Sequence, residues 1–473
     1  MNITIRKFEA KDIPLKVEWI NNPLNNRYLH YNLPLKEDET YRWFERNQNR
    51  IDRYDATIEA DGIAIGLIGL LDIDFQNYKA EYYITIGNRE YLGKGIAFQA
   101  SKLLLEYAFY ELRLNRIFLF TEYNNTAAQR LFEKIGFKKE GLVQDDLFYK
   151  GRYVSRFLYG ICKDDFARNV ETPISFLGYN YNNYIYMKRD DLFPFSFGGN
   201  KARKAMLFWK DLKKQNADCL VTYGSSSSNH CRVMANIAAS EGILCYIISP
   251  EEISHETYNR KMMEDLGAKM IFCKVEEVHD KIEFILAELR QEGYNPYFVQ
   301  GGGHGNIGTQ AYVDCYEEIN RYEERNHICF DYIFHASGTG TTQAGLVCGK
   351  LLRNGKNKIV GISIARKYPY GRNIVKESVK EYLGEKITEK EIEENVIFDD
   401  SCIADGYGIG NGSIYEVIGM VMRQYGIPLD MTYTGKAFWG MKKYLIKNKI
   451  KNKKILFIHT GGTPLFFDDL GEY

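Results

Sequence analysis

The chain has 473 residues, with 62 lysines and arginines balanced by 62 aspartates and glutamates, and nine scattered cysteines. A neutral balance creates no field that favours nucleic acid or an anionic membrane, so we expect small-molecule partners. Apolar runs are only strand-sized, and no Cys-x-x-Cys pair or His/Cys cluster has ligand spacing. We therefore expect a cytoplasmic protein with no spanning helix, disulfide framework or metal site.

The length also predicts two domains, because one hydrophobic core rarely covers so many residues. Charged residues interrupt the apolar pattern between Cys162 and Thr172, just before Pro173. We place one domain at residues 1–165 and the other at residues 170–473. Frequent glycine, 41 residues in all, is typical of α/β domains with many strand-to-helix turns.

The N-terminal part begins with a predicted strand at Ile3–Arg6 and has a predicted hairpin turn at Asp61-Gly62. Alternating side chains predict another strand at residues 81–87. A Gly-x-Gly turn follows within residues 91–97, and a helical pattern covers residues 100–109. Such a turn between a strand and a helix points successive backbone N–H groups at a pyrophosphate.

Residues 125–137 form an amphipathic helical pattern closed by Gly136 and followed by a strand. With the glycine turn, this pattern resembles the GNAT acyltransferase superfamily, closest to its ribosomal-protein and amino-sugar N-acetyltransferase branch. That branch has a Trp-x-Asn feature, matched here by Trp19, Asn21 and Asn22. The resemblance implies an α/β GNAT domain that uses acetyl-CoA. The implied ligands are Leu92, Gly93, Lys94, Gly95, Ile96 and Ala97 for the diphosphate, and Asn125 for the pantetheine arm.

Glu81 is the candidate base that deprotonates the acceptor amine, because it lies on the strand that leads into this turn. A solvated edge residue is the alternative interpretation. Many GNAT members use a tyrosine on the last helix as the acid, and here that position is Phe132. The acceptor stays open among amino sugars, peptide N-termini, amino acids and small amines. A second hypothesis makes the domain an acyl-CoA-sensing regulatory module.

In the C-terminal part, Ser-Phe-Gly-Gly-Asn-Lys-Ala-Arg-Lys spans residues 196–204 and begins an apolar-periodic segment. A lysine on a glycine-rich turn is how a pyridoxal phosphate enzyme presents its reactive amine, so Lys201 is the candidate catalytic lysine. Gly198 and Gly199 let the backbone approach a flat cofactor closely. A helix-entry turn with a solvated lysine is the alternative.

Three further loops follow strand-like runs at residues 219–223, 332–335 and 455–458. They are rich in serine, threonine and glycine, and so offer backbone N–H groups and hydroxyls to an anion. Loops of this kind at the ends of parallel strands meet at one edge of a sheet. The four segments together predict one ligand crevice.

From about Thr172 to the C-terminus the chain resembles the fold-type II pyridoxal phosphate enzymes, in the branch with D-cysteine desulfhydrase and 1-aminocyclopropane-1-carboxylate deaminase. The motifs that carry this resemblance are residues 188–191, 198–201, 228–230, 342–345, 406–408, 433–436 and 459–462. The family fold is like the tryptophan synthase β chain, with two parallel-sheet αβα subdomains, and implies a homodimer.

By this resemblance Lys201 is the covalent attachment point of pyridoxal 5'-phosphate. The other implied ligands are Lys204, Gly338, Thr339, Gly340, Thr341 and Thr342 for the phosphate, Asn229 for the phenolic oxygen, and Ser228 with Asn229 for the substrate carboxylate. Tyr407 and Tyr433 would face the substrate as acid, base or gate, or form a wall.

Thr434 and Thr460 distinguish the two activities, since the deaminase branch has glutamate and leucine there and the desulfhydrase branch has two threonines. We assign both threonines to the cofactor ring. A hydroxyl holds the pyridine nitrogen weakly, which suffices when a thiol leaves. The expected products are pyruvate, ammonia and sulfide, and the whole chain is expected to be a bifunctional enzyme. Deamination and β-replacement stay open, as does another amino acid, because Ser227 replaces the usual glutamine.

Overall fold

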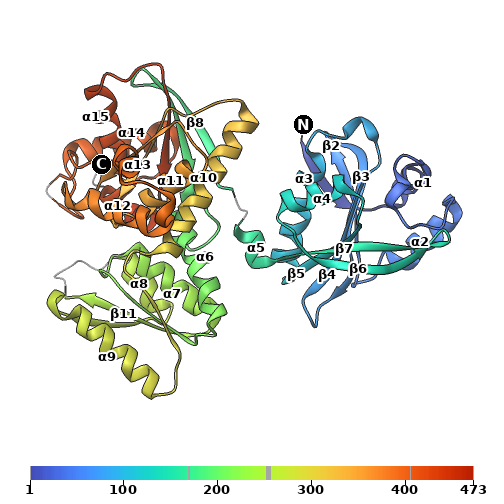
Figure 1. The fold of residues 1–473 in the computed structure, drawn as a ribbon, viewed down its shortest axis with the longest axis horizontal. Coiled ribbons are helices and arrows are strands. Elements are labelled where there is room, and N and C mark those ends of the chain that lie inside the picture. Colours follow the sequence, from blue (N-terminus) through green and yellow to red (C-terminus); the bar gives the residue numbers. More distant parts are fainter. Residues whose placement is uncertain (1, 169–170, 252–256, 405, 472–473) are drawn as a thin grey trace. The chain divides into compact units, whose positions relative to one another are not determined.

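The structure is a computed structural model that describes residues 2–168, 171–251, 257–404 and 406–471 (Figure 1). Contacts between residues divide the chain into two compact units, Met1–Val170 and Glu171–Tyr473. Among the described residues, none of the helices combines the length and the apolar character needed to cross a membrane.

The first unit is built on one seven-stranded sheet in the order β1-β2-β3-β4-β5-β7-β6. Its neighbouring strands are antiparallel except β4 and β5, which are parallel. The elements are β1 (Ile3–Lys7), α1 (Ile13–Asn21), α2 (Glu37–Asn47), β2 (Tyr54–Ala60), β3 (Ile63–Asp74), β4 (Lys79–Ile86), α3 (Ile96–Glu106), β5 (Arg116–Glu122), α4 (Thr126–Ile135), β6 (Lys138–Tyr149), β7 (Arg152–Cys162) and α5 (Lys163–Arg168).

Local signals account for these elements. The predicted turn at Asp61-Gly62 joins β2 to β3 with φ of +50° and +81°, as a two-residue hairpin requires. The predicted helix at residues 125–137 is confirmed as α4, which Asn125 caps at its start and Gly136, at φ +114°, ends. Helix α3 begins at Ile96, four residues before its apolar pattern, because Gly95 turns the chain directly into it.

The second unit contains two sheets, as the resemblance implies. The order is β12-β11-β10-β13 in one and β16-β15-β14-β17-β9-β8 in the other. Their strands are parallel apart from the edge strand β8. The strands are β8 (Ile174–Asn180), β9 (Asn183–Arg189), β10 (Cys219–Tyr223), β11 (Leu244–Pro250), β12 (Lys269–Cys273), β13 (Pro296–Val299), β14 (Tyr332–Ser337), β15 (Lys358–Ser363), β16 (Ile397–Asp399) and β17 (Lys454–His459).

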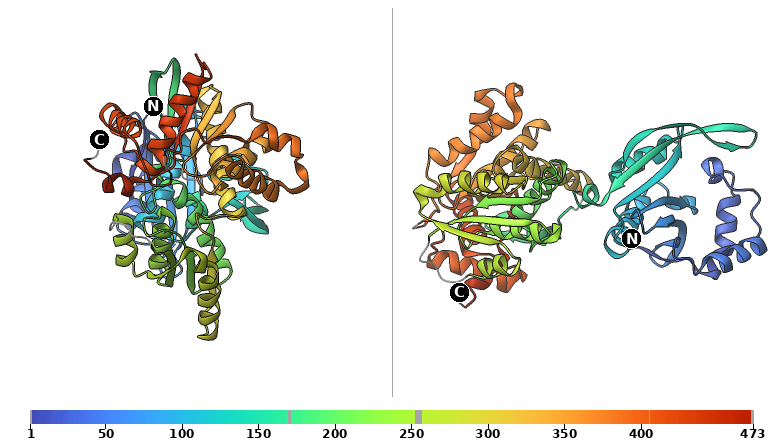
Figure 2. Two further views of the ribbon diagram at one scale, coloured as in Figure 1. Left: turned by 90° about the vertical axis from the view of Figure 1, so that its left-hand side faces the viewer. Right: turned by 90° about the horizontal axis from the view of Figure 1, so that it is seen from below.

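Helices cover both faces of the six-stranded sheet (Figure 2). Along β17, Ile455 and Phe457 pack with side chains of α14 and α15, whereas Leu456 and Ile458 pack with those of α10, α11 and α12. All four are fully buried, which explains the continuous apolar run. The helices are α6 (Gly199–Lys214), α7 (Asn229–Glu241), α8 (Tyr258–Asp265), α9 (Val278–Gln291), α10 (Asn306–Asn326), α11 (Thr341–Leu352), α12 (Tyr370–Leu383), α13 (Glu389–Asn395), α14 (Gly412–Tyr425), α15 (Lys436–Lys447) and α16 (Thr463–Asp468).

A buried ionic network ties the start of α6 to β9 and α10. Arg203 donates to Glu318 at 2.6 Å and to Asp190 at 2.9 Å, and Lys188 donates to Glu318 at 2.7 Å. Each of these four side chains is at most 6% exposed. The network therefore fixes the helix turn that carries Lys201.

Replacing Glu318 by alanine leaves two buried cations short of a partner, so we expect the unit to lose roughly 3–5 kcal/mol of unfolding free energy. Its neighbour Glu317 forms an exposed pair with Arg353, and Glu317→Ala is expected to cost about 1 kcal/mol or less. Calorimetry of the full chain measures the unfolding free energy of both variants. Equal losses in the two variants would contradict a structural role for the network.

Candidate functional site

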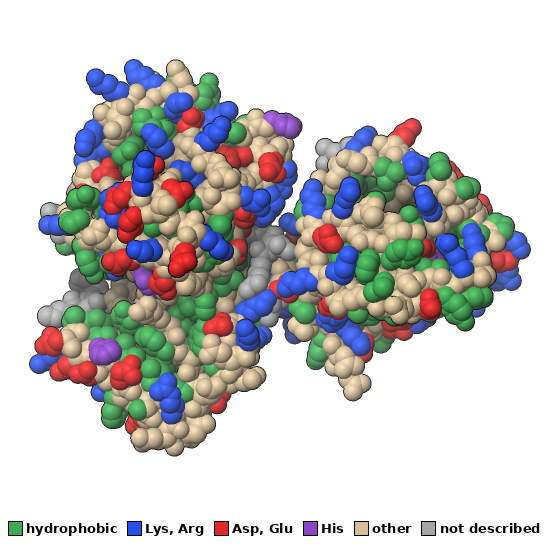
Figure 3. All heavy atoms as spheres, in the orientation of Figure 1, with side chains coloured by type: hydrophobic (Ala, Val, Ile, Leu, Met, Phe, Trp, Pro, Cys, Tyr) green, Lys and Arg blue, Asp and Glu red, His purple; other side chains and the backbone are tan. Residues whose placement is uncertain are grey.

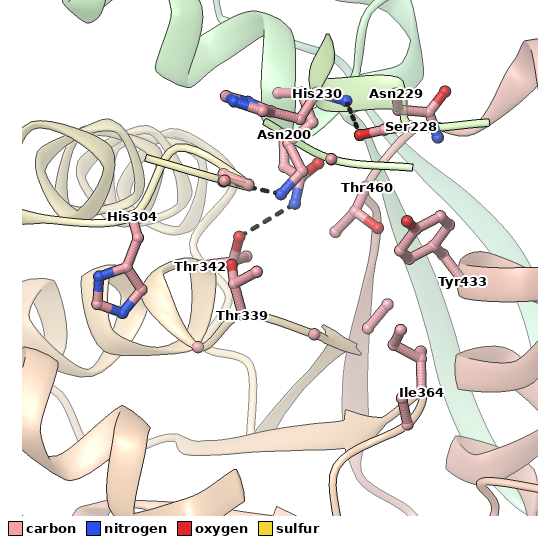
Figure 4. A pocket seen from close by; sticks show the side chains of 18 of the residues that line it. Asn200, Ser228, Asn229, His230, His304, Thr339, Thr342, Ile364, Tyr433 and Thr460 are labelled. Atoms are coloured by element: carbon pink, nitrogen blue, oxygen red, sulfur yellow. Dashed lines mark hydrogen bonds between the residues drawn. The ribbon is translucent and has the colours of Figure 1, made fainter. Parts of the chain in front are cut away.

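A cavity of about 700 Å³ opens at the carboxyl ends of the parallel strands of the second unit (Figure 4). Its wall comes from loops that follow five strands: Gly224 and Ser225 after β10, residues 300–302 after β13, 338–340 after β14, 364–366 after β15, and 460–462 after β17. The crevice predicted from the strand-end loops is thus confirmed as one place in the fold.

Lys201 lies in the first turn of α6, on the wall of this cavity. Residues 196–199, just before it, all have positive φ, between +45° and +90°. This left-handed run turns the chain sharply, so that the Lys201 Nζ donates to the Gly302 carbonyl at 3.0 Å. Burial lowers the pKa of Lys201 to about 8. About a tenth of the amine is therefore neutral, and so nucleophilic, at pH 7, whereas less than about one part in a thousand of an exposed lysine would be.

This lowered pKa predicts how the cofactor-free protein takes up pyridoxal phosphate. Only the neutral amine attacks an aldehyde, so the incorporation rate should rise with a midpoint near pH 8. An exposed lysine would give a midpoint at about 10.4. Stopped-flow absorbance over a pH series measures the midpoint, with Lys201→Arg as the variant that should not react. A midpoint above pH 9.5 would contradict the lowered pKa of Lys201, and incorporation in Lys201→Arg would exclude Lys201 as the reacting amine.

The loop after β14 offers a site for a phosphate. Gly338, Thr339, Gly340 and Thr342 line the cavity at the start of α11. Thr341 does not, because its hydroxyl accepts a 2.5 Å hydrogen bond from the buried Lys204 Nζ. Burial and the neighbouring Lys201 hold the Lys204 pKa well below its usual value, and no described carboxylate pairs with Lys204.

Lys204, predicted as a phosphate ligand, does not line the cavity either, because its buried amine lies behind the loop and donates to Thr341 and Gly302. A phosphate dianion in the cavity would face the free backbone N–H groups at the start of α11, with the Lys204 amine behind them. Asn200, which the sequence analysis did not assign, donates to Thr342 at 3.1 Å and completes this end of the cavity. The residues present therefore fit the phosphate of pyridoxal phosphate.

Ser228 and Asn229 form the opposite wall, at the start of α7. The Ser228 hydroxyl caps the helix and accepts from the backbone N–H groups of His230 and Cys231. The Asn229 amide lies beside it in Figure 4. Cys231, next along the helix, is fully buried, and burial raises its pKa to about 12, so its thiol is a packed side chain.

Thr434 and Thr460, both predicted to contact the cofactor ring, lie in different surroundings in the structure. Thr460 lines the cavity, but Thr434 does not. The Thr434 hydroxyl donates to Asp430 Oδ1 at 2.6 Å, and Asp430 also caps this turn by accepting from the backbone of Tyr433 and Thr434. Direct contact of Thr434 with the cofactor ring is therefore not what the structure shows, because the capping carboxylate holds its hydroxyl.

Tyr407 and Tyr433 both line the cavity, and their hydroxyl oxygens are 2.5 Å apart. Burial, and to a smaller extent the nearby Tyr407, raises the Tyr433 pKa well above its usual value. Tyr433 is thus a neutral phenol that carries a proton at any physiological pH, rather than a phenolate base.

Sequence reasoning missed two groups of lining residues. One comprises Gln300, Gly301, Gly302 and His304, and the glycine run after a strand was a signal of the same kind as the others. The second is the charged end formed by Arg366, Tyr370 and Glu377, which have no local motif. Arg366 donates to the Thr339 carbonyl at 3.1 Å and so supports the phosphate loop.

In the first unit, Gly93 and Gly95 have φ of +75° and +77° and lead into α3. A Cβ at either glycine would meet nothing within 4 Å, so the surface of the turn formed by Leu92 to Ala97 is open. Asn125 follows β5, and its Oδ1 accepts from Ala128 as the cap of α4. Backbone N–H groups at the turn can therefore face a diphosphate.

Strands β4 and β5 pair only from Lys79 with Arg116 to Glu81 with Phe118, and then separate. Glu81 is the last paired residue of β4, at the point of separation. Burial raises the pKa of this half-buried carboxyl, a favourable property for a base. Phe132 is 6% exposed and packs against Tyr82, so it is a core side chain.

Charged side chains do not divide into regions of one sign on the face shown in Figure 3, where lysine and arginine alternate with aspartate and glutamate.

Residues 169–461 match the family model for pyridoxal-phosphate dependent enzymes, and residues 2–138 match that of the acetyltransferase (GNAT) domain. A D-cysteine desulfhydrase of Serratia proteamaculans is 33% identical over 60% of this chain and 88% of its own length, and one of Yersinia enterocolitica is also 33% identical over 60% and 88%. A crystal structure of an ACC deaminase homologue has a TM-score of 0.57 at 30% identity, covering 64% of this chain and 93% of that one.

These matches begin and end where the two sets of motifs lie, and the cavity supplies the lysine, the phosphate loop and the crevice of such an enzyme. The chain belongs to the pyridoxal-phosphate dependent enzymes, in the D-cysteine desulfhydrase and ACC deaminase group, and carries a GNAT acetyltransferase domain at its N-terminal end.

Proposed function

We propose that the second unit removes the thiol of D-cysteine, or of a closely related β-thiol amino acid, in a β-elimination. Water completes the reaction, which converts D-cysteine and one water into pyruvate, ammonia and hydrogen sulfide. The observation that carries the proposal is the single cavity in which Lys201, an anion-binding loop and the Ser228-Asn229 turn face one another. A relative named D-cysteine desulfhydrase aligns with this chain over 88% of its own length.

Pyridoxal phosphate, when bound, withdraws electrons from the bonds at the substrate α-carbon. The start of α11, supported from behind by Lys204, would hold its phosphate, and Lys201 would provide the amine that attaches it. Ser228 and Asn229 receive the substrate carboxylate, which orients the α-hydrogen. The role of these side chains is to bind the cofactor and to orient the substrate.

Proton transfer falls to Lys201 and the tyrosine pair. With a pKa of about 8, the Lys201 amine can be neutral and accept the α-proton. The hydroxyl pair of Tyr407 and Tyr433 then gives a proton to the departing sulfur, a role that the raised Tyr433 pKa supports. A thiolate leaves readily, so one weak acid is sufficient.

Release of sulfide and pyruvate by the purified protein tests the proposal, with D-cysteine, L-cysteine and 1-aminocyclopropane-1-carboxylate compared at equal concentration. We expect D-cysteine to be the best of the three. Ammonia and 2-oxobutyrate from the cyclopropane would favour the deaminase alternative. If the cofactor is bound but none of the three compounds is turned over, the substrate is instead another amino acid that the Ser225 to Ser228 run accepts.

For the first unit we propose acetyl transfer from acetyl-CoA to an amine, with Glu81 as the base. The open Gly93-Gly95 turn and the separation of β4 from β5 support a bound acetyl-CoA, and the raised Glu81 pKa supports the base. The two activities together make the chain bifunctional.

Thiol release from acetyl-CoA, screened against amino sugars, amino acids, peptides and small amines, tests the transferase. Removing the base by Glu81→Gln should lower the rate with the best acceptor roughly 10²-fold or more. Glu59→Gln, on β2, is a control that should leave the rate unchanged. If no amine is acetylated while acetyl-CoA changes the lyase rate, the unit is a sensor and the transferase proposal is wrong.

A further inference from the structure

A second buried amide, outside the cavity wall, sets the orientation of Asn229. Asn259 lies on α8 and is fully buried. Its Nδ2 donates to the Ser227 carbonyl at 2.8 Å and to Asn229 Oδ1 at 3.0 Å. Both hydrogens of this amide are therefore directed at the turn that begins α7.

The Ser227 carbonyl removes the usual ambiguity of amide orientation. The oxygen and nitrogen of a side-chain amide are distinguished only by their hydrogen-bond partners. A backbone carbonyl can only accept, so Asn259 must turn its Nδ2 toward Ser227. The second hydrogen of that Nδ2 then requires an acceptor, and Asn229 must present its oxygen.

The consequence for Asn229 is that its nitrogen faces the other way. In Figure 4 the Asn229 nitrogen lies on the side of Thr460 and Tyr433, and the oxygen lies on the opposite side. Asn229 lines the cavity, and its Nδ2 donates to no other residue that the structure describes. Two N–H donors are thus held ready for a ligand oxygen.

The remaining atom of Asn259 points to the same role. Asn259 Oδ1 is buried and has no hydrogen-bond partner among the described residues. An unpaired buried oxygen is unfavourable, and a leucine of similar size would avoid it. Packing alone therefore does not explain an asparagine at this position, whereas the need for two donors does.

We propose that Asn259 is a positioning residue of the cofactor site. It holds Asn229 in the orientation in which the Asn229 amide donates to the ring oxygen of pyridoxal phosphate. The inference rests on the proposed function, because that function requires bound pyridoxal phosphate, whose ring oxygen the family resemblance assigns to Asn229.

The test uses Asn259→Leu, which keeps the volume and removes both donors, and Asn259→Asp, which keeps the shape and turns an acceptor toward Ser227. The readouts are the visible absorption band of the bound cofactor, the pH at which that band changes, and the dissociation constant of pyridoxal phosphate. We expect the pH midpoint to move by about 1 unit and the dissociation constant to rise about tenfold in both variants.

Asn183→Leu is the matched control. Asn183 is also fully buried, and its amide also donates to two carbonyls, those of Tyr181 and Ile450. It lies at the amino end of β9, whereas the cavity lies at the carboxyl ends of the strands. This variant should lose stability with an unchanged absorption band. A shift of the band in Asn183→Leu equal to that in Asn259→Leu would overturn the inference, because non-specific destabilisation of the second unit would then explain both shifts.

Asn229→Ala separates the inference from the function on which it rests. If Asn229→Ala moves the band and Asn259→Leu adds nothing in the double variant, Asn259 acts through Asn229 as proposed. If Asn229→Ala moves the band but neither Asn259 variant does, the positioning role is wrong and the Asn229 assignment stands. If Asn229→Ala leaves the band unchanged, the assignment of Asn229 to the ring oxygen fails, and the inference fails with it.

Discussion

Replacing Lys201 by alanine is expected to lower D-cysteine turnover by at least roughly 10³-fold, because one side chain supplies both the cofactor attachment and the base for the α-proton. The amine is placed for both tasks, since it lies on the cavity wall and burial lowers its pKa to about 8. Sulfide release gives the rate, and the visible band of the dialysed protein reports whether the cofactor stays attached.

Two controls make this result specific to the amine. Lys350 also has a pKa lowered by burial, but it lies in the last turn of α11, donates to Asn395 and does not line the cavity. Turnover in Lys350→Ala should therefore be unchanged. Methylamine should restore part of the activity of Lys201→Ala, because a small amine can enter the space that the side chain leaves. Near-normal turnover in Lys201→Ala would show that another group is the base.

The sequence predicted the part of the site that depends on local signals. Glycines and hydroxyl residues directly after buried strands predicted the loops of Ser228, Gly338 and Thr460, and the structure brings these together because all parallel strands of a sheet end at one edge. A glycine-rich turn before a helix predicted Lys201. The hairpin of the first unit follows from the same kind of local pattern, whereas the two sheets of the second unit were expected from the family resemblance.

The rest of the site depends on contacts between distant segments. Asn259 lies 30 residues from Asn229 on a helix with no motif, and only packing shows that their amides meet. Thr434 shares a motif with Tyr433, but the Asp430 carboxylate takes its hydroxyl, which spacing alone does not reveal. Arg366 lies in the loop after the neighbouring strand β15 and donates to the phosphate loop at Thr339, which no local motif reveals.

Gly199→Ala should give the second large effect, a fall in D-cysteine turnover of roughly 10²-fold, because it displaces the turn that carries Lys201. Gly199 has φ of +90°, which an alanine adopts only under strain. An added Cβ would lie 2.7 Å from the Thr460 carbonyl oxygen and 2.9 Å from the Gly461 Cα. Both are backbone atoms, so no side chain can swing aside.

The same carbonyl accepts a 2.9 Å hydrogen bond from the Asn200 N–H, which holds the start of α6 against the end of β17. The clash therefore separates the lysine turn from the loop of Thr460, and the cofactor loses two walls of its site at once. We expect weaker pyridoxal phosphate binding and a stability loss of about 2–4 kcal/mol.

Gly242→Ala is the matched control, because Gly242 has φ of +68° and a Cβ there would meet nothing within 4 Å. It should cost about 1 kcal/mol of stability and leave turnover unchanged. Both variants place alanine at a strained backbone position, but only Gly199→Ala disturbs the close approach of α6 to the Thr460 loop. Comparing turnover rates and cofactor dissociation constants of the two variants therefore separates these two causes. Full activity in Gly199→Ala would mean that this approach is not needed to place Lys201.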